Sequence, residues 1–313
     1  MKKAVIVGSR SQDGIFLKKY LIDLGYNVVG ICRDYIEYSY SSKKSETIDI
    51  LDEDEIINFL RNENPKEIYY FSAYNHSSES LISENKDALE LANNLHFVSP
   101  MIFLQSIKIF NKKIKFFYAC SSHIFGNSSQ FPQNELTKVS PQTIYGITKA
   151  SGLFGCRKFR NDKIFVSTGI LYSHVSENRS EKFLSKKISS AVARIYAGSN
   201  ETISVGNLDA KIDWGYAKDY VEAMHAVLQL NKPDDFIISS GKAHSVKDFI
   251  SLAFEFIGLD YRNYVKVNEN IVKRNFNPLI GNPKKIQTLT GWKPKTKFKE
   301  LVKILMRKEI DSL

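Results

Sequence analysis

The stretch Ala4-Val5-Ile6-Val7-Gly8-Ser9-Arg10-Ser11-Gln12-Asp13-Gly14 determines the fold class of this chain. Its apolar start is typical of a buried parallel strand, and apolar residues at helical spacing follow from Phe16 to Leu24. A strand, a glycine turn and a helix in this order point backbone N–H groups and a helix N-terminus at a pyrophosphate. Ser11 stands where the usual Gly-x-x-Gly-x-x-Gly pattern has its middle glycine.

The alternation of apolar strands and helical segments continues along the chain and predicts a doubly wound parallel sheet of the α/β class. The less regular part after Leu171 predicts a smaller lobe over the carboxyl edge of the sheet, where ligands of such folds bind. Strands are expected over 27–31, 67–72, 114–119 and 163–169, with a third strand signal at 47–50, and helices over 52–60, from about residue 87, and around Tyr145. The expected domains are a Rossmann-like domain over 1–170, with a return segment at about 206–239, and a C-terminal lobe made of 171–205 and 240–313.

The composition favours an ordinary globular protein with a small polyanionic ligand. Among the 313 residues, 44 Lys and Arg stand against 34 Asp and Glu, and the positive residues are scattered rather than gathered on one helix, which disfavours nucleic-acid binding. The three cysteines are far apart, lack metal-ligand spacing and are odd in number, which argues against a metal site and a disulfide framework. With no signal peptide and no span of membrane length, we expect a cytoplasmic protein.

Tyr145 and Lys149 are four residues apart on a predicted helix and therefore share one face. A tyrosine titrates near about 10, which is too high for a base at neutral pH. A neighbouring ammonium stabilises the phenolate and lowers the pKa, so the pair could take a proton from an alcohol while hydride leaves the same carbon. A surface helix turn is the alternative interpretation of this spacing.

Several segments resemble, in order along nearly the whole chain, the GDP-mannose 4,6-dehydratase family of extended short-chain dehydrogenases/reductases. They are Ser11 to Gly14, Glu67-Ile68-Tyr69, Pro132-Gln133-Asn134-Glu135, Gly169 to His174, Glu181-Lys182-Phe183, Gly206 to Gly215, Lys218-Asp219-Tyr220 and Gly291-Trp292-Lys293-Pro294. The resemblance implies a nicotinamide cofactor at the glycine turn, a GDP-sugar between the lobes, and a homo-oligomer, dimer or tetramer, built through the Tyr145 helix and the helix after about residue 87.

The resemblance also implies roles for individual residues. Tyr145 and Lys149 would be the oxidation pair, and Ser121 would bond the 4-hydroxyl of the sugar. Asp49 would contact adenine, although it is equally a helix-start acid. The implied cofactor residues are Gly8, Arg10, Ser11, Gln12, Asp13, Gly14, Arg33, Asp34, Asp49, Ile50, Phe71, Ser72, Ala73, Tyr145 and Lys149. The implied substrate residues are Tyr74, Ser122, His123, Ser173, His174, Lys182, Phe183, Lys187, Gly206, Asn207, Leu208, Lys211, Trp214 and Arg274.

The sequence departs from the family at the catalytic Glu, which is replaced by His123. In the family that Glu removes the proton on carbon 5 and helps the 6-hydroxyl leave as water. Neutral imidazole could serve as base and then acid, but it is shorter and differently aimed, and elimination needs close geometry. His123 could equally fill space and bond a sugar hydroxyl, which would leave oxidation without dehydration.

Other departures concern binding. Beside the sugar the family has a series of Asn, Gln, Ser and His, where this chain has Tyr70, Tyr74, Asn75 and His76, so Tyr74 and Asn75 indicate an altered pocket. Ile212 replaces an Arg beside the sugar phosphates. Lys187, with Arg274 or Lys273, could supply the positive charge that this Arg provides, since any cation can pair with a diphosphate. Arg33 would suit the 2′-phosphate of NADP, whereas Asp34 would repel it, so we favour NAD(H) over NADP(H).

The leading hypothesis is therefore an NAD(P)-dependent enzyme that oxidises the 4-hydroxyl of a GDP-mannose-type sugar, hexose or heptose, to a 4-keto sugar for surface polysaccharide synthesis. The alternatives are a GDP-sugar 4,6-dehydratase that uses His123, a GDP-keto-sugar reductase or epimerase, and a non-catalytic nucleotide-sugar binding subunit.

Overall fold

The computed structural model describes residues 1–41, 44–74, 86–268, 271 and 277–313. Its main feature is an eight-stranded sheet in the order β12-β7-β6-β5-β1-β2-β3-β4. The six strands from β12 to β2 are parallel, while β3 and β4 form an antiparallel hairpin at one edge. The strands are β1 (Lys3–Val7), β2 (Asn27–Ile31), β3 (Tyr35–Tyr38), β4 (Lys44–Glu46), β5 (Glu67–Tyr70), β6 (Lys115–Ser121), β7 (Val166–Leu171) and β12 (Asp235–Ile238).

The predicted doubly wound sheet is confirmed, but the third strand signal at 47–50 was wrong. This segment forms no strand, because its polar groups make the hydrogen bonds that lead into the following helix. The backbone N–H of Asp49 donates to the Glu55 carboxylate at 2.8 Å, and its carboxylate accepts from the Leu51 N–H at 2.8 Å. The hairpin of β3 and β4, which the sequence did not reveal, lies beside β2 instead.

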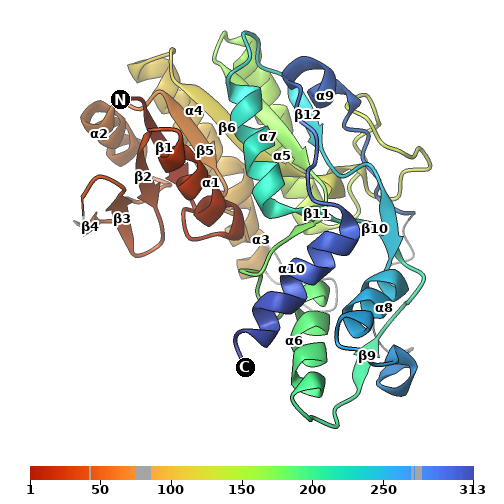
Figure 1. The fold of residues 1–313 in the computed structure, drawn as a ribbon. Coiled ribbons are helices and arrows are strands. Elements are labelled where there is room, and N and C mark those ends of the chain that lie inside the picture. The colour runs from red at the N-terminus through yellow and green to blue at the C-terminus, as the bar shows by residue number, and fades with distance from the viewer. Residues whose placement is uncertain (42–43, 75–85, 269–270, 272–276) are drawn as a thin grey trace.

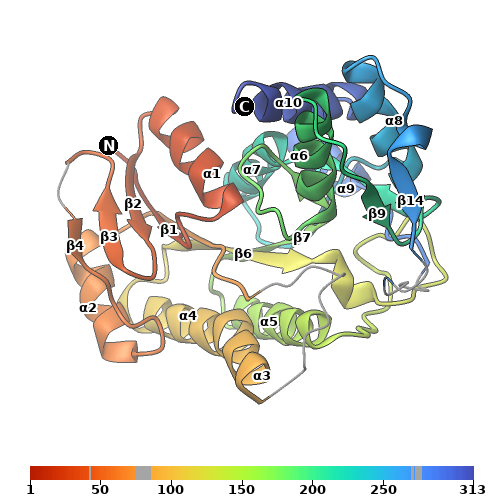
Figure 2. The ribbon, with the colours of Figure 1, turned by 90° about the horizontal axis from the view of Figure 1, so that it is seen from below.

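Helices cover both faces of the sheet, as Figure 2 shows with the sheet seen nearly edge-on. On one face lie α2 (Glu53–Glu63), α3 (Lys86–Asn93), the π-helical turn η1 (Asn94–Val98), α4 (Ser99–Phe110) and α5 (Ile144–Asn161). On the other lie α1 (Gln12–Asp23) and α7 (Ala217–Leu228), with α9 (Lys284–Thr290) packed against α7 and β12. Each face buries its own hydrophobic cluster, so the sheet is covered on both sides, as a parallel sheet requires.

A third hydrophobic cluster joins a further set of elements, of which Figure 1 shows α6, α8, β9 and α10 below the sheet. The set comprises β8 (His174–Val175), α6 (Leu184–Tyr196), β9 (Ile203–Val205), β10 (Lys211–Asp213), β11 (Gly215–Tyr216), α8 (Val246–Phe256), β14 (Val265–Val267) and α10 (Phe298–Ile310), with the 3-10 turn η3 (Tyr261–Asn263). The strand β13 (Ala243–Ser245) pairs with β10. The residue bounds that we expect for the two domains stay a prediction. In the described part of the chain, no helix combines the length and apolarity needed to cross a membrane.

The sheet topology fixes where a ligand can bind. After β1 the chain turns to β2 on one side, and it later returns to β5 on the other side of β1. In open α/β sheets, ligands bind at the carboxyl ends of the strands where the strand order reverses in this way. Gly8, which directly follows β1, lies at that point.

Candidate active site

The turn after β1 has the close approach that a phosphate-binding turn needs. Gly8 has φ +87°, which L side chains rarely adopt, and a Cβ there would lie 2.9 Å from the Ser72 nitrogen. A Cβ on Gly14 would lie 2.6 Å from the Gly8 oxygen, so both glycines are required sterically. Ser11 has φ −67° and caps α1 by accepting the Gly14 N–H at 3.0 Å. The middle glycine of the pattern is therefore not needed here, and serine supplies an N-cap.

The first turn of α1 is joined to the segment after β7. Gln12 donates to the His174 carbonyl at 3.3 Å and accepts from the Ser176 hydroxyl at 2.9 Å. His174 Nε2 contacts the Asp13 carboxylate at 3.0 Å. Burial raises the pKa of Asp13, but His174, Gln12 and Arg179 together outweigh burial and hold this pKa below its ordinary value. The cofactor residues expected on α1 and the substrate residue His174 thus form one cluster.

Ser121, Tyr145 and Lys149 come together at the carboxyl end of β6. Ser121 ends β6, and its side chain lowers the pKa of Tyr145, which lies in the first turn of α5. Thr143 caps that helix by accepting the Gly146 N–H at 3.1 Å. Lys149 is 2 % exposed, and its ammonium donates to the Ala119 carbonyl at 2.7 Å and lies 5.9 Å from the centre of the Tyr145 ring. This is the arrangement expected for proton abstraction from an alcohol.

The pKa of Tyr145 differs from the sequence-based expectation. Burial raises it above its ordinary value, and the side chains of Ser121 and Arg179 partly offset that rise. The Lys149 ammonium bonds the Ala119 carbonyl, and its role as the partner of Tyr145 stays a prediction. Burial also lowers the pKa of Lys149 to about 8. The protein around Tyr145 therefore favours the neutral phenol.

His123 lies directly beside Tyr145. It belongs to the 3-10 turn η2 (Ser122–Phe125) that follows β6, where its N–H donates to the Ser121 hydroxyl at 3.3 Å. The His123 and Tyr145 rings meet edge-on, with centroids 5.5 Å apart and planes at 89°. A Cβ at Gly146 would lie 2.6 Å from the His123 carbonyl oxygen, so the turn is held tightly against α5.

Comparison with known proteins identifies the family. The model of the GDP-mannose 4,6 dehydratase family matches residues 5–305. The chain belongs to this family. A GDP-mannose 4,6 dehydratase of Cricetulus griseus is 32% identical over 346 residues, covering 99% of this chain and 92% of that protein.

Solved structures share the fold. RMD from Pseudomonas aeruginosa, complexed with NADPH, has a TM-score of 0.85 at 16% identity and covers 100% of both chains. The dTDP-glucose 4,6-dehydratase of Bacillus anthracis, in complex with NAD, has a TM-score of 0.82 at 12% identity and covers 98% of this chain and 96% of its own. The architecture is therefore that of extended short-chain dehydrogenases/reductases, and the chain is an enzyme of the GDP-mannose 4,6-dehydratase family.

The remaining cofactor residues implied by the family lie around the glycine turn or at its border. Phe71, Ser72 and Ala73 follow β5 and lie over Gly8. Arg10 and Asp34 pair at 3.7 Å with both side chains exposed, and Arg33 is exposed beside them. Asp49 is exposed, whereas Ile50 packs against the core under β1.

The implied substrate residues are more dispersed. Ser173 follows β7, and its carbonyl accepts the Gly215 N–H at 2.8 Å, which links the segment of Trp214 to that of His174. Ser122 and Trp214 are buried, and Tyr74 donates its N–H to His96. Lys187 donates to the Ser204 carbonyl at 3.2 Å. Lys182 and Phe183 directly precede α6, whereas Gly206, Asn207, Leu208 and Lys211 lie around β9 and β10. Asn75, His76, Lys273 and Arg274 lie outside the described residues.

Two residues near Tyr145 escaped the sequence analysis. Arg179 donates to the His174 carbonyl, and its guanidinium lies 4.0 Å from the centre of the Phe183 ring. Its Nε is buried and has no hydrogen-bond partner among the described residues, and burial lowers the pKa of Arg179 to about 10. The position of Arg179 between two family motifs, at His174 and Phe183, was a signal that could have revealed it. His96, which is buried and meets the Tyr145 ring edge-on, lies in no motif.

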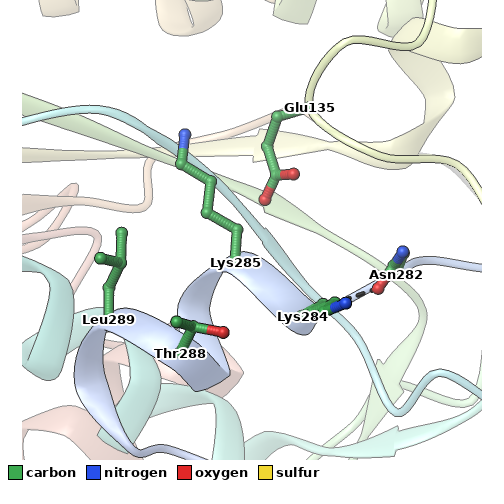
Figure 3. Close-up of a pocket in the computed structure, with 6 residues that line it drawn as sticks. All are labelled: Glu135, Asn282, Lys284, Lys285, Thr288 and Leu289. Atoms are coloured by element: carbon green, nitrogen blue, oxygen red, sulfur yellow. Dashed lines mark hydrogen bonds between the residues drawn. The ribbon is translucent and has the colours of Figure 1, made fainter.

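A cavity of about 390 Å³ lies away from these residues, at the edge strand β12 (Figure 3). Glu135 and Lys285 face it from opposite sides, and Asn282, Lys284, Thr288 and Leu289 complete its lining. Glu135 accepts the Ile237 N–H at 2.9 Å, and Lys285 donates to the Asp235 carbonyl at 2.8 Å. These side chains cap the open edge of the sheet, which gives the cavity a structural explanation. Among the described residues, no cluster of three or more His, Cys, Asp or Glu side chains could hold a metal ion.

Proposed function

We propose that this enzyme oxidises the 4-hydroxyl of a GDP-bound mannose-type sugar, hexose or heptose, and releases the 4-keto sugar nucleotide without loss of water. The observation that carries the proposal is the Ser121–Tyr145–Lys149 set beside His123 rather than a carboxylate. Ser121 would hold the 4-hydroxyl, and Tyr145 would accept its proton. A bound nicotinamide cofactor would accept the hydride from carbon 4.

The phenol of Tyr145 must lose its proton before it can act as base. Arg179 favours the phenolate. The Lys149 ammonium, 5.9 Å from the centre of the Tyr145 ring, would add a second positive charge. The oxidised nicotinamide ring also carries a positive charge, so its binding would lower the pKa of Tyr145 further.

Elimination of water requires a catalytic group that oxidation does not require. One group must remove the proton on carbon 5 and then protonate the departing 6-hydroxyl. The His123 ring stands edge-on to Tyr145 in the short turn η2, and its backbone is fixed against Gly146. Elimination is sensitive to small displacements of the base, so the exchange of Glu for the shorter imidazole supports oxidation alone. A dehydratase that uses His123 is the second candidate.

The decisive experiment is a product mass spectrum after incubation with a panel of GDP-hexoses and GDP-heptoses and added NAD. A product lighter by two hydrogens, with stoichiometric reduced nicotinamide, is the expected result. A product lighter by one water would establish the dehydratase, and an isomer of unchanged mass would establish an epimerase. If no sugar is altered, the protein is a binding subunit, and Tyr145→Phe should then leave GDP-sugar affinity and every other property unchanged.

For the cofactor we propose NAD. The Asp34 carboxylate, paired with Arg10 at the end of β2, can bond ribose hydroxyls and would repel a 2′-phosphate. The structural neighbours described above were solved with NADPH in one case and NAD in the other, so both nucleotides suit this fold. Dissociation constants for NAD and NADP, measured by titration without sugar, test the choice.

We further propose a cytoplasmic homo-oligomer, dimer or tetramer, that forms through α3 and α5. Exposed apolar side chains support this, since Ile147 and Phe154 on α5 are 50% and 52% exposed and Leu89 and Leu91 on α3 are 46% and 40% exposed. Paired surfaces of this kind mark interfaces between subunits. Light scattering of the wild-type protein and of Phe154→Glu should show a loss of the oligomer in the variant.

A further inference from the structure

His96 is fully buried beside Tyr145, in the turn η1 that joins α3 to α4. The two rings meet edge-on, with centroids 5.2 Å apart and planes at 89°. Tyr145 therefore makes edge-on contacts with two imidazole rings, those of His96 and His123. Single π-helical turns such as η1 occur often at functional sites.

Both ring nitrogens of His96 have partners, and together they fix its tautomer. Nε2 accepts the N–H of Tyr74 at 3.0 Å, and Nδ1 lies 2.8 Å from the Thr148 hydroxyl oxygen. The Thr148 hydroxyl donates its only proton to the Ile144 carbonyl at 2.9 Å, so it must accept from His96. The proton of the neutral ring is therefore on Nδ1. Burial lowers the pKa of His96 to about 2, so the ring stays neutral at physiological pH.

The two hydrogen bonds reach different parts of the site. Tyr74 ends the segment 71–74 after β5, and this segment lies directly on the glycine turn, where Gly8 leaves no room for a Cβ beside Ser72. Thr148 lies between Tyr145 and Lys149 on the first turns of α5. One imidazole thus joins the glycine turn side of the site to the helix of the oxidation pair.

The backbone of His96 is fixed as well, so the ring has little freedom to move. The Tyr118 hydroxyl donates to the His96 carbonyl at 2.7 Å. A Cβ at Gly152 would lie 2.4 Å from the same carbonyl oxygen, so only glycine allows α5 to approach η1 this closely.

We propose that His96 is a positioning residue with two separable tasks: Nε2 holds the segment 71–74 over the glycine turn, and Nδ1 holds the helical turn that carries Tyr145 and Lys149. The first task governs cofactor affinity and the second governs turnover. The identity of the cofactor and of the sugar rests on the function proposed above, whereas the two hydrogen bonds of His96 are independent of it.

Two substitutions separate the tasks. In His96→Asn the amide N–H can replace Nδ1 as donor to Thr148, but the Tyr74 N–H loses its acceptor. In His96→Gln the longer amide can still accept from Tyr74, but the donor to Thr148 is lost. Both variants remove the ring, so each controls for lost packing in the other. Ser151→Ala, on the same helix and with the same kind of bond to a carbonyl one turn earlier, is the neutral control.

We expect His96→Asn to weaken NAD binding about tenfold while kcat at saturating NAD changes less than about twofold, because the segment 71–74 loses the hydrogen bond that holds it over the glycine turn. His96→Gln should bind NAD within about twofold of wild type and lose about tenfold in kcat. Thr148→Val should reproduce the result of His96→Gln, which keeps the test valid if one histidine variant fails to fold.

Equal losses of NAD affinity and kcat in the two histidine variants would overturn the proposal, as would unchanged NAD affinity in His96→Asn. NAD affinity is measured by fluorescence titration without sugar. A protein that shows the expected pattern of NAD binding but turns over no GDP-sugar would therefore refute the proposed function alone.

Discussion

His174 Nε2 lies 3.0 Å from each carboxylate oxygen of Asp13 and so joins the first turn of α1 to the segment after β7. The side chains of both residues are only 14% exposed. The positive charge of the Arg179 guanidinium also lowers the pKa of Asp13. This cluster of polar and charged side chains thus connects α1, beside the glycine turn, to the segment after β7, which leads to the smaller lobe.

Asp13→Asn should destabilise the fold in a pH-dependent way. Because the pKa of Asp13 is lower in the folded state, its stabilising effect is present above its ordinary pKa of about 3.9 and is lost as the pH falls through the folded pKa. We expect the free energy of unfolding of the variant to be about 1–3 kcal/mol below that of wild type at pH 7, and this difference to shrink towards about pH 3. Urea unfolding across this range checks it, with the exposed Asp23→Asn as control. A difference independent of pH would contradict the charge argument.

Lys149→Met should abolish turnover but stabilise the protein near neutral pH. Burial lowers the pKa of Lys149 to about 8, so between about 8 and the ordinary 10.5 the unfolded chain holds a proton that the folded one lacks, and stability rises with pH. Removing the buried charge should raise the free energy of unfolding by about 1–2 kcal/mol at pH 7, reduced by the cost of losing the hydrogen bond to Ala119. This gain should vanish by about pH 10. Thermal unfolding at both pH values measures this. A variant less stable than wild type at pH 7 would show that the bond to Ala119 dominates.

Arg179→Gln should shift the pH dependence of turnover upwards. Burial raises the pKa of Tyr145 and Arg179 opposes that rise, so removal of the guanidinium makes the phenolate harder to form. We expect kcat/KM at pH 7 to fall about tenfold and the rising limb of the pH profile to move to higher pH by about one unit. Arg179→Lys keeps the charge and should move the limb less. Arg194→Gln, which removes a surface ion pair with Glu201, serves as control; a shift in that variant too would point to net charge instead.

His123→Glu should give the enzyme a capacity for water loss. A carboxylate beside Tyr145 can remove the proton on carbon 5 of the ketone and return it to the departing hydroxyl. We expect the fraction of product lighter by one water to rise at least about tenfold, measured by mass spectrometry. His123→Gln, which has a similar shape but cannot take a proton, should show no such rise. No gain with Glu would mean that His123 already performs elimination or that the site lacks room for it.

The core of the fold was predictable because its signals are local. The apolar run before Gly8 and the helical spacing after it both lie within the short stretch from Ala4 to Leu24, and later strands repeat that pattern. The hairpin of β3 and β4 was missed because strands of three and four residues, of which β4 is exposed throughout, carry little periodicity. The same reasoning placed a strand at 47–50, where the side chains of Asp49 and Glu55 build a helix entry instead.

The sequence by itself determined the parallel sheet, the glycine turn and the common face of Tyr145 and Lys149, since strand alternation and helix periodicity depend only on near neighbours. Tertiary structure alone decided what surrounds Tyr145. His96 reaches it through a π-helical turn, and Asp13 meets His174 across 161 residues of chain. Tertiary structure also decided that Lys149 bonds a carbonyl and that burial raises the pKa of Tyr145. Burial and long-range charge arise only when distant segments pack together, and no spacing along the chain encodes them.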